Sequence, residues 1–347
     1  MKNNIRVKLV SRGSVDKDIL GFLNQTIHNS GKLGVCEFIF NSFERNYDWL
    51  VIIDDIPRAL KKSYEELACS IENTILVTTE PSTITRYGKN FASQFKYLIT
   101  NQDEKILPHK RALRSQTGNV WMYGKNYDDI INMDIPNKNK NISTVCSNKQ
   151  QGHTLHKKRY NFTLKLQREI PEIARFGWGY KPIDTKVEAL DNFKFHVCIE
   201  NHIGKDVWTE KIADAFLAYC LPIYYGCPNI LDYFPKDSII LIDLDDFDSS
   251  IEKIKTIINT PGEYEKRLEF ITEARELLIH KYNLLEMINN IVEKNNKSDN
   301  LTKNIKIFNR RTMRGRSISD FTKFVFWKIE NFLKSKLKTK RTSIENK

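Results

Sequence analysis

Residues 193–228 of this 347-residue chain read FKFHVCIENHIGKDVWTEKIADAFLAYCLPIYYGCP, and this stretch decides the fold. Phe193–Ile199 is a short run of apolar, aromatic and β-branched residues, which predicts a buried strand. Thr209 can cap a helix that has apolar residues at helical spacing, and Leu221–Tyr225 is a second apolar run that ends at Gly226. The pattern therefore predicts a β-α-β unit whose loop follows the carboxyl end of a strand.

Polar and charged side chains are concentrated in that loop and in the first turn of the helix. They are Glu200, Asn201, His202, Lys205, Asp206, Glu210 and Lys211. Open α/β sheets bind ligands outside the carboxyl ends of their strands, and a helix N-terminus favours anions. We therefore expect a site for a polar, anionic ligand here.

Strands and helices alternate through the N-terminal third of the chain. The segments IRVKLV (5–10), DWLVII (48–53), TILVTT (74–79) and FKYLIT (95–100) predict strands, and Leu60–Ser70 predicts a helix. Alternation of this kind is typical of a parallel sheet.

Two polar segments suggest where the domains divide. DIPNKNKNIS at 134–143 has a proline and no apolar periodicity, so it is the predicted interdomain linker, and a second polar segment begins at Lys294. The expected parts are residues 1–135, 136–295 and 296–347.

The net charge of +12 lies almost entirely in the tail. Residues 301–347 hold 14 Lys and Arg against 3 Asp and Glu, whereas the other 300 residues hold 41 against 40. A nucleic-acid-binding domain carries a basic stripe on its folded body, so we expect no nucleic-acid partner.

A basic amphipathic helix is predicted at Ser319–Lys338. Its apolar positions are Phe321, Phe324, Val325, Ile329, Phe332 and Leu333, with Trp327 beside them. Such a helix fits binding in the plane of an anionic membrane, here through residues 301–341. The alternative is a helix that packs on the body of the protein with its lysines in water.

The cysteines and the N-terminus bear on the compartment. Six scattered cysteines without a Cys-x-x-Cys pair are typical of free thiols in a reducing environment, and Met1–Ser14 is too polar for a secretory signal. We expect a cytoplasmic protein, peripheral on the cytosolic face of a membrane. No metal ligand set and no cofactor are predicted.

The central stretch resembles the C-terminal signature of glycosyltransferase family 10, the α-1,3/4-fucosyltransferases, in a bacterial-type member. The matching residues are Lys194-Phe195, Glu200-Asn201, Thr209-Glu210-Lys211, Ala215, Pro222 and Gly226. The alternative is an ordinary β-α-β unit with a solvated loop. The resemblance implies an α/β protein of the GT-B type, with two Rossmann-like domains facing a cleft. The first domain would bind the acceptor and the second the nucleotide sugar.

The resemblance also implies donor-binding residues. Lys211 at the start of a helix and Arg159 within KKRYNFTLKL would offset the charge of a departing diphosphate, and Asn201 and Glu210 would contact ribose or the donor sugar. Helical spacing would bury Phe162 and leave Arg159 facing the cleft. The alternative for Arg159 is a surface position in a basic helix.

The predicted catalytic base is Glu80, which follows the strand TILVTT. In bacterial members of the family the base is a glutamate in this context, and a base in a cleft needs a raised pKa. The alternative is a carboxylate that closes a turn with Pro81.

The predicted function is therefore an inverting transfer of L-fucose from GDP-fucose to a glycan hydroxyl in α-1,3 linkage, on a lipopolysaccharide, O-antigen or similar glycan. Val207 stands where many family members have tyrosine, so another nucleotide sugar stays open as the donor. Two further alternatives are a metal-dependent transferase that uses Asp243 and Asp245, and a non-catalytic protein that binds anions or membranes.

Overall fold

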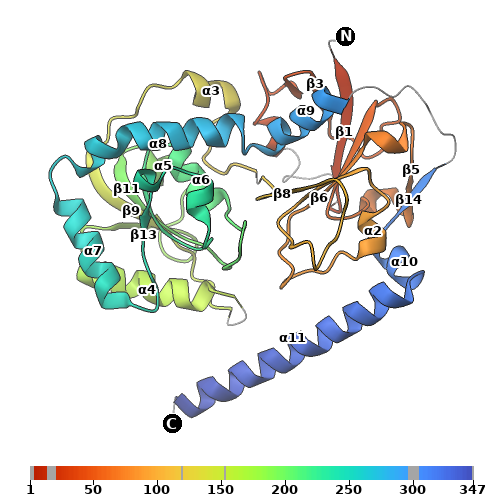
Figure 1. Cartoon of the computed structure of the whole chain (residues 1–347). Helices are drawn as coiled ribbons and strands as arrows, with labels where there is room; N and C mark the ends of the chain where they lie inside the picture. The colour runs from red at the N-terminus through yellow and green to blue at the C-terminus, as the bar shows by residue number, and fades with distance from the viewer. Residues whose placement is uncertain (1–3, 14–20, 119, 152–153, 296–304, 346–347) are drawn as a thin grey trace. The chain divides into compact units, whose positions relative to one another are not determined.

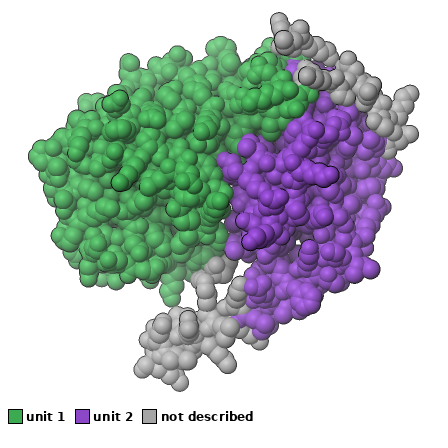
Figure 2. All heavy atoms as spheres, in the orientation of Figure 1, with its two compact units in different colours: residues 1–4, 16–38, 116–295 green, residues 5–15, 39–115, 296–347 purple. Residues whose placement is uncertain are grey.

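The computed structural model describes residues 4–13, 21–118, 120–151, 154–295 and 305–345, with side chains to residue 333. These residues form two compact units, coloured separately in Figure 2. Unit 1 comprises the described parts of 1–4, 16–38 and 116–295, and unit 2 those of 5–15, 39–115 and 296–347.

Unit 1 contains a five-stranded, wholly parallel sheet in the order β10-β9-β11-β12-β13. Its strands are β9 (Lys140–Val145), β10 (Ala174–Phe176), β11 (Phe193–Ile199), β12 (Leu221–Tyr225) and β13 (Ile240–Leu241). Its helices are α3 (Tyr127–Asn132), α4 (His156–Glu169), α5 (Val187–Leu190), α6 (Glu210–Leu217), α7 (Phe247–Asn259), α8 (Glu263–His280) and α9 (Leu284–Asn295). Helices α5, α6 and α8 cover one face of this sheet, and α4 packs with α7 on the other (Figure 1).

The predicted β-α-β unit is present with the expected boundaries. Strand β11 is buried along its length except at Lys194, and β12 lies beside it in parallel register, with Phe195 opposite Leu221. Helix α6 buries six of its eight residues between the sheet and α8. A short antiparallel hairpin, β2 (Lys32–Leu33) and β3 (Cys36–Ile39), precedes these elements in the chain.

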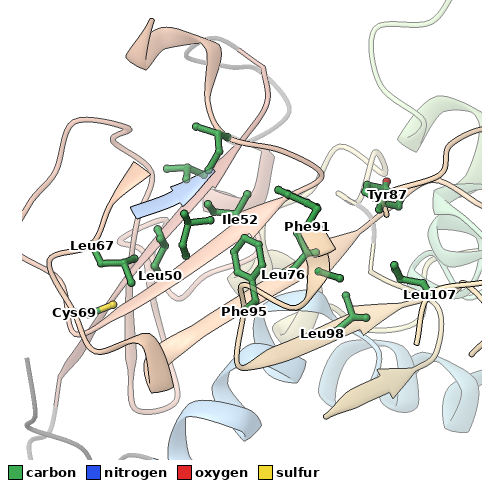
Figure 3. Close-up of a cluster of buried hydrophobic side chains, with 14 of the residues drawn as sticks. Leu50, Ile52, Leu67, Cys69, Leu76, Tyr87, Phe91, Phe95, Leu98 and Leu107 are labelled. Atoms are coloured by element: carbon green, nitrogen blue, oxygen red, sulfur yellow. The ribbon is translucent and has the colours of Figure 1, made fainter. Parts of the chain in front are cut away.

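Unit 2 is built on parallel strands in the order β1-β4-β6-β7-β8. They are β1 (Ile5–Ser11), β4 (Trp49–Ile53), β6 (Thr74–Thr78), β7 (Tyr97–Thr100) and β8 (Ala112–Arg114). All five residues of β4 and of β6 are buried, as expected for parallel strands covered on both faces. Figure 3 shows one core cluster, where Leu50 and Ile52 of β4 meet Phe91 of α2 (Lys89–Ala92). The α/β fold with two parallel sheets is thereby confirmed.

The helix predicted at Leu60–Ser70 is wrong. The chain forms a strand there instead, β5 (Tyr64–Glu66), which pairs antiparallel with β14 (Lys306–Phe308). Glu65 turns inward and binds Lys8 of β1 with its Oε1 3.0 Å from Lys8 Nζ, both side chains being buried. The partner strand lies more than 230 residues further along the chain, so local spacing carried no sign of it.

The observed division also differs from the expected boundaries at 135 and 296. The predicted linker at 134–143 runs into β9, which begins at Lys140 and lies between β10 and β11 in the sheet of unit 1. Residues just before it are held in the same unit, because Lys125 pairs with Asp191 at 2.8 Å and Arg275 donates to the carbonyl of Ile130. Unit 1 accordingly begins its main segment at Gln116.

The segment expected to be a tail folds onto unit 2. Ile307 of β14 is fully buried in the core cluster of Figure 3, and α10 (Arg310–Gly315) packs on α2. Helix α11 (Ile318–Glu345) then begins, and Asp320 near its start accepts hydrogen bonds from the backbone N–H groups of Lys89 and Asn90.

We predict that Ile307→Ala destabilises the protein by about 2–5 kcal/mol, because it leaves a cavity in a packed core. Denaturant unfolding of the full chain measures this. The matched control is Lys306→Ala on the same strand, whose side chain is exposed and whose loss should cost less than about 0.5 kcal/mol. Equal effects of the two substitutions would show that β14 is not seated in the core.

Candidate functional site

The loop after β11 is anchored by a buried carboxylate. Glu200, 1% exposed, accepts hydrogen bonds from Thr209 N at 2.8 Å and from the Thr209 hydroxyl, and its Oε2 lies 3.3 Å from Lys211 Nζ. The same hydroxyl caps α6 by accepting from the backbone N–H of Lys211. A Cβ on Gly226 would lie 2.5 Å from Glu200 Cγ, so the glycine of β12's turn leaves room for this carboxylate. The start of α6 is therefore held in one place.

A pocket of 230 Å³ opens at this end of the sheet. Its walls come from α4, from the segments after β9 and β10, from β11 and its loop, and from α6. The four predicted donor-binding residues, Arg159, Asn201, Glu210 and Lys211, all line it. The structure thus brings together side chains that are up to 52 residues apart in the sequence.

Lys211 is held in the pocket by three oxygen atoms. Its Nζ lies 2.9 Å from the Thr209 hydroxyl, 3.2 Å from Glu210 Oε1 and 3.3 Å from Glu200 Oε2. Burial disfavours the charge, but the carboxylates of Glu200 and Glu210 outweigh it and raise the pKa of Lys211 above its usual value. Lys211 is therefore a fixed positive charge at a helix N-terminus.

Arg159 and Asn201 present polar atoms that the protein itself leaves unpaired. The spacing on α4 buries Phe162 as expected, and Leu166 with it, but Arg159 is itself only 7% exposed. Its Nε and the Oδ1 of Asn201 are buried without a hydrogen-bond partner among the described residues. Since buried polar groups are nearly always paired, both atoms favour a bound polar ligand.

The charge of the pocket wall is positive overall. Four cations, Lys149, Arg159, Lys186 and Lys211, stand against two carboxylates, Glu210 and Asp214. Lys186 and Lys211 lower the pKa of Glu210 in spite of its burial, so this carboxylate stays ionised. This excess of positive charge favours a ligand with more than one negative charge, because such a ligand can contact the cations and the helix N-terminus at the same time.

Sequence reasoning missed several residues of the pocket. Lys186 pairs with Asp214 at 2.6 Å, and burial raises the pKa of Asp214 to about 6. His196 is buried in β11, and burial lowers its pKa to about 3, so the ring is neutral. Trp178 also lines the pocket while 75% of its side chain is exposed. Only the exposed tryptophan, in the glycine-flanked GWG, left a signal in the sequence.

Glu80 lies in unit 2, directly after β6. Its backbone N–H donates to the Tyr87 hydroxyl at 3.1 Å, and that hydroxyl donates to Asp54. Asp54, at φ 64°, also accepts from the N–H and hydroxyl of Thr79. Surrounding protein atoms and the nearby Asp54 carboxylate raise the pKa of Glu80, against the opposing charge of Arg310. The direction is the one a base needs, while the role of Glu80 stays a prediction.

The two aspartates named as possible metal ligands have protein partners. Exposed Asp245 pairs with Lys158 at 2.5 Å. Asp243 Oδ1 accepts from the backbone N–H of Asp245. Among the residues that the structure describes, no three His, Cys, Asp or Glu side chains are grouped so as to hold a metal ion.

Val207, where the family has tyrosine, is not among the residues that line the pocket. Its neighbour Trp208 points into an aromatic cluster, with its ring 5.1 Å from that of Phe234 and 5.6 Å from that of Tyr233. This cluster, together with Tyr282, packs the loop against the body of unit 1.

Residues 135–298, which carry the whole pocket, match the family model described as glycosyltransferase family 10 (fucosyltransferase) C-term. This segment, a little under half of the chain, is therefore similar to the C-terminal domain of that family. The resemblance expected from the sequence is thereby confirmed.

Two curated relatives agree with the family domain. The chain is 40% identical over 78 residues to an alpha-(1,3)-fucosyltransferase FucT of Helicobacter pylori, which is 22% of this chain and 16% of the relative. It is 30% identical over 155 residues to 4-galactosyl-N-acetylglucosaminide 3-alpha-L-fucosyltransferase 9 of Bos taurus, or 43% of this chain and 38% of the relative. The matches thus span well under half the length of these curated relatives.

A solved structure extends the likeness to most of the chain. The crystal structure of an alpha1,3-fucosyltransferase with GDP-fucose aligns with a TM-score of 0.50 at 18% identity, covering 88% of this chain and 94% of the other. At this identity the likeness shows the fold alone, and it agrees with the GT-B class expected for two Rossmann-like units.

Proposed function

We propose that the protein is a fucosyltransferase, which transfers L-fucose from GDP-fucose to a hydroxyl of a glycan acceptor. The observation that carries the proposal is the pocket of the family domain. It unites Arg159, Asn201, Glu210 and Lys211 and leaves two buried polar atoms, Arg159 Nε and Asn201 Oδ1, for a ligand. The named relatives and the solved neighbour add support, because they are α-1,3-fucosyltransferases, one of them bound to GDP-fucose.

In this proposal Lys211 and Arg159 bind the diphosphate and offset the negative charge that grows on it as the bond to the sugar breaks. Fixed charges act strongly on a leaving group because they need no reorganisation during the reaction. Asn201 and Glu210 hold the ribose or the sugar with hydrogen bonds. Trp178 offers an exposed ring on which a planar base can stack.

We further propose an inverting reaction with Glu80 as the base. Glu80 takes the proton of the acceptor hydroxyl, whose oxygen attacks the anomeric carbon while GDP departs. The raised pKa of Glu80 supports this role, since a carboxylate with a higher pKa accepts a proton more readily. The α-1,3 linkage and a lipopolysaccharide or O-antigen acceptor belong to the same proposal.

The last part of the proposal is that α11 binds an anionic membrane, on its cytosolic face. One side of α11 packs on unit 2 through Asp320 and Trp327, both at most 9% exposed. The other side leaves large apolar residues in solvent: Ile318, Phe321, Val325, Phe326, Ile329, Phe332 and Leu333. The packed side agrees with the alternative of a helix on the body of the protein, and the exposed apolar side supports the proposed membrane contact. No helix in the described part of the chain has the length and apolar content of a membrane span.

The free thiols support the proposed location in a reducing compartment. All six cysteines are free and buried, as is usual in a reducing environment.

We predict that the purified full chain turns over GDP-fucose in preference to GDP-mannose and UDP-sugars, with the same rate in EDTA. Lys211→Met should weaken GDP binding about 10- to 100-fold, since a hydrogen bond to a charged group contributes roughly 1.5–3 kcal/mol. Calorimetric titration with GDP measures this.

Lys194→Met is the matched control for Lys211→Met. Lys194 is half-buried, pairs with Glu265 and lies outside the pocket, so GDP affinity should stay within about twofold. If the protein prefers another nucleotide sugar, the domain assignment still holds, but fucose is not the donor sugar. Loss of activity in EDTA would favour a metal-dependent transferase, and no binding of any nucleotide sugar would favour the non-catalytic alternative.

We predict that Glu80→Gln lowers kcat by about 10²- to 10⁴-fold while GDP-fucose still binds, because the base is lost and the donor pocket is intact. In the wild type kcat/KM should rise with pH through an apparent pKa above the ordinary glutamate value, since the base must be deprotonated. Initial rates across pH measure both. Unchanged kcat in Glu80→Gln would contradict the role of Glu80.

We predict that the double substitution Phe321→Ser, Ile329→Ser weakens binding to anionic vesicles at least about tenfold, since each exposed side chain contributes apolar area at the membrane. Vesicle flotation of the full chain measures it. Phe43→Ser is the control, because Phe43 is 60% exposed elsewhere in unit 2. Equal binding by all three proteins would rule out α11 as the membrane contact.

A further inference from the structure

Unit 2 contains a pocket of 310 Å³ between α11 and the loops that follow β6 and β7. We call it the α11 pocket. The loop after β6 contributes Arg86, the start of α2 contributes Lys89, and the loop after β7 contributes Lys105. From the C-terminal segment come Arg314 and Lys323. Three separate parts of the chain therefore place cations around one cavity.

The positive charge of the α11 pocket is not balanced from within. Five cations line it against two carboxylates, Asp320 and Glu330. Asp320 is engaged already, because its two oxygens accept the backbone N–H groups of Lys89 and Asn90. Other cations of unit 2 have carboxylate partners, such as Lys8 with Glu65 and Arg310 with Asp55. In the α11 pocket the cations outnumber the carboxylates.

Two arginines of the α11 pocket are partly withdrawn from water. The Nε of Arg86 is buried and has no hydrogen-bond partner among the described residues. The guanidinium of Arg314 lies 3.5 Å from the ring centre of Phe324, and burial, together with Arg310, lowers the pKa of Arg314. An unpaired, dehydrated guanidinium is stabilised by a charged acceptor, and phosphate oxygens suit its fork of donors.

The rim of the pocket continues into the apolar side of α11. Phe326 lines the cavity and is 71% exposed, and it belongs to the same exposed apolar set as Phe321 and Ile329. A ligand in the cavity would therefore have its charged end among arginines and lysines and its other end beside apolar side chains. That is the arrangement of a phospholipid, with a charged headgroup next to acyl chains.

We propose that the α11 pocket binds the phosphate of an anionic phospholipid headgroup, and that this contact orients α11 on the membrane. The inference rests on the membrane association proposed above and names the chemistry of the partner. A soluble phosphate compound shares the charged end, but it leaves the apolar rim and the exposed side of α11 uncovered.

The test is flotation of the full-length protein with phosphatidylcholine vesicles, with and without phosphatidylglycerol. Arg86→Gln should lose about fivefold of the affinity for vesicles that contain phosphatidylglycerol, the effect of one basic residue at an anionic surface. Lys323→Gln, at an exposed position of the same pocket, should change binding in the same direction and guards against misfolding of the first variant.

Two matched controls remove one charge outside the pocket. Arg58→Gln lies on the exposed surface of unit 2, and Lys328→Gln lies on α11 itself without lining the cavity. Arg58→Gln should leave binding within about twofold, and Lys328→Gln should cost less than Arg86→Gln. If Lys328→Gln and Arg86→Gln lose the same vesicle affinity, the proposed lipid site in the α11 pocket is wrong, because the charges would then act by diffuse attraction to the membrane surface.

Glycerol phosphate in solution distinguishes the source of the phosphate. If it stabilises the wild type but not Arg86→Gln against heat, while phosphatidylglycerol has no effect on flotation, the occupant is a soluble phosphate and the lipid is excluded. Turnover of GDP-fucose should be unchanged in Arg86→Gln, because this residue lies outside the donor pocket. If the protein has no transferase activity but Arg86→Gln still weakens binding to phosphatidylglycerol vesicles, the proposed enzyme function is wrong. The proposed lipid-binding pocket would still hold.

Discussion

The buried carboxylate of Glu200 is the constraint on which the site depends. It stands at the end of β11, accepts both donors of Thr209 and lies beside Lys211, so one side chain joins strand, loop and helix. A buried carboxylate without partners would be strongly unfavourable, so the loop cannot move away from it cheaply. Lys211 is held at the helix N-terminus as a consequence, with its charge secured by Glu200 and Glu210.

A second constraint links the C-terminal segment to the surroundings of Glu80. Arg310 pairs with Asp55 and lies 4.9 Å from the ring centre of Tyr87, whose hydroxyl binds Asp54 and receives the backbone N–H of Glu80. Residues expected to form only a membrane tail therefore contribute to the electrostatic environment of the predicted base. Arg310 opposes the rise in the pKa of Glu80 that burial and Asp54 produce.

The sequence predicted the central β-α-β unit well because its signals are local. Phe193–Ile199 and Leu221–Tyr225 match β11 and β12, and Thr209 caps α6 as expected. It failed at Leu60–Ser70, where the chain pairs with β14, and at 134–143, where the polar segment includes the first residues of β9. In both places contacts with distant segments outweigh a weak local preference.

By itself, the sequence determined where the central strands and α6 of residues 193–228 lie, how α6 is capped and which loop is polar, since these features follow from neighbouring residues. The tertiary structure alone decided that Lys186 and Trp178 join the predicted residues in one pocket, and that Arg86 faces cations from α10 and α11. These contacts depend on the order of the strands and on the packing of the C-terminal segment against unit 2. Burial of side chains from distant parts of the chain sets both, as when Ile307 packs into the core with β4 and β6.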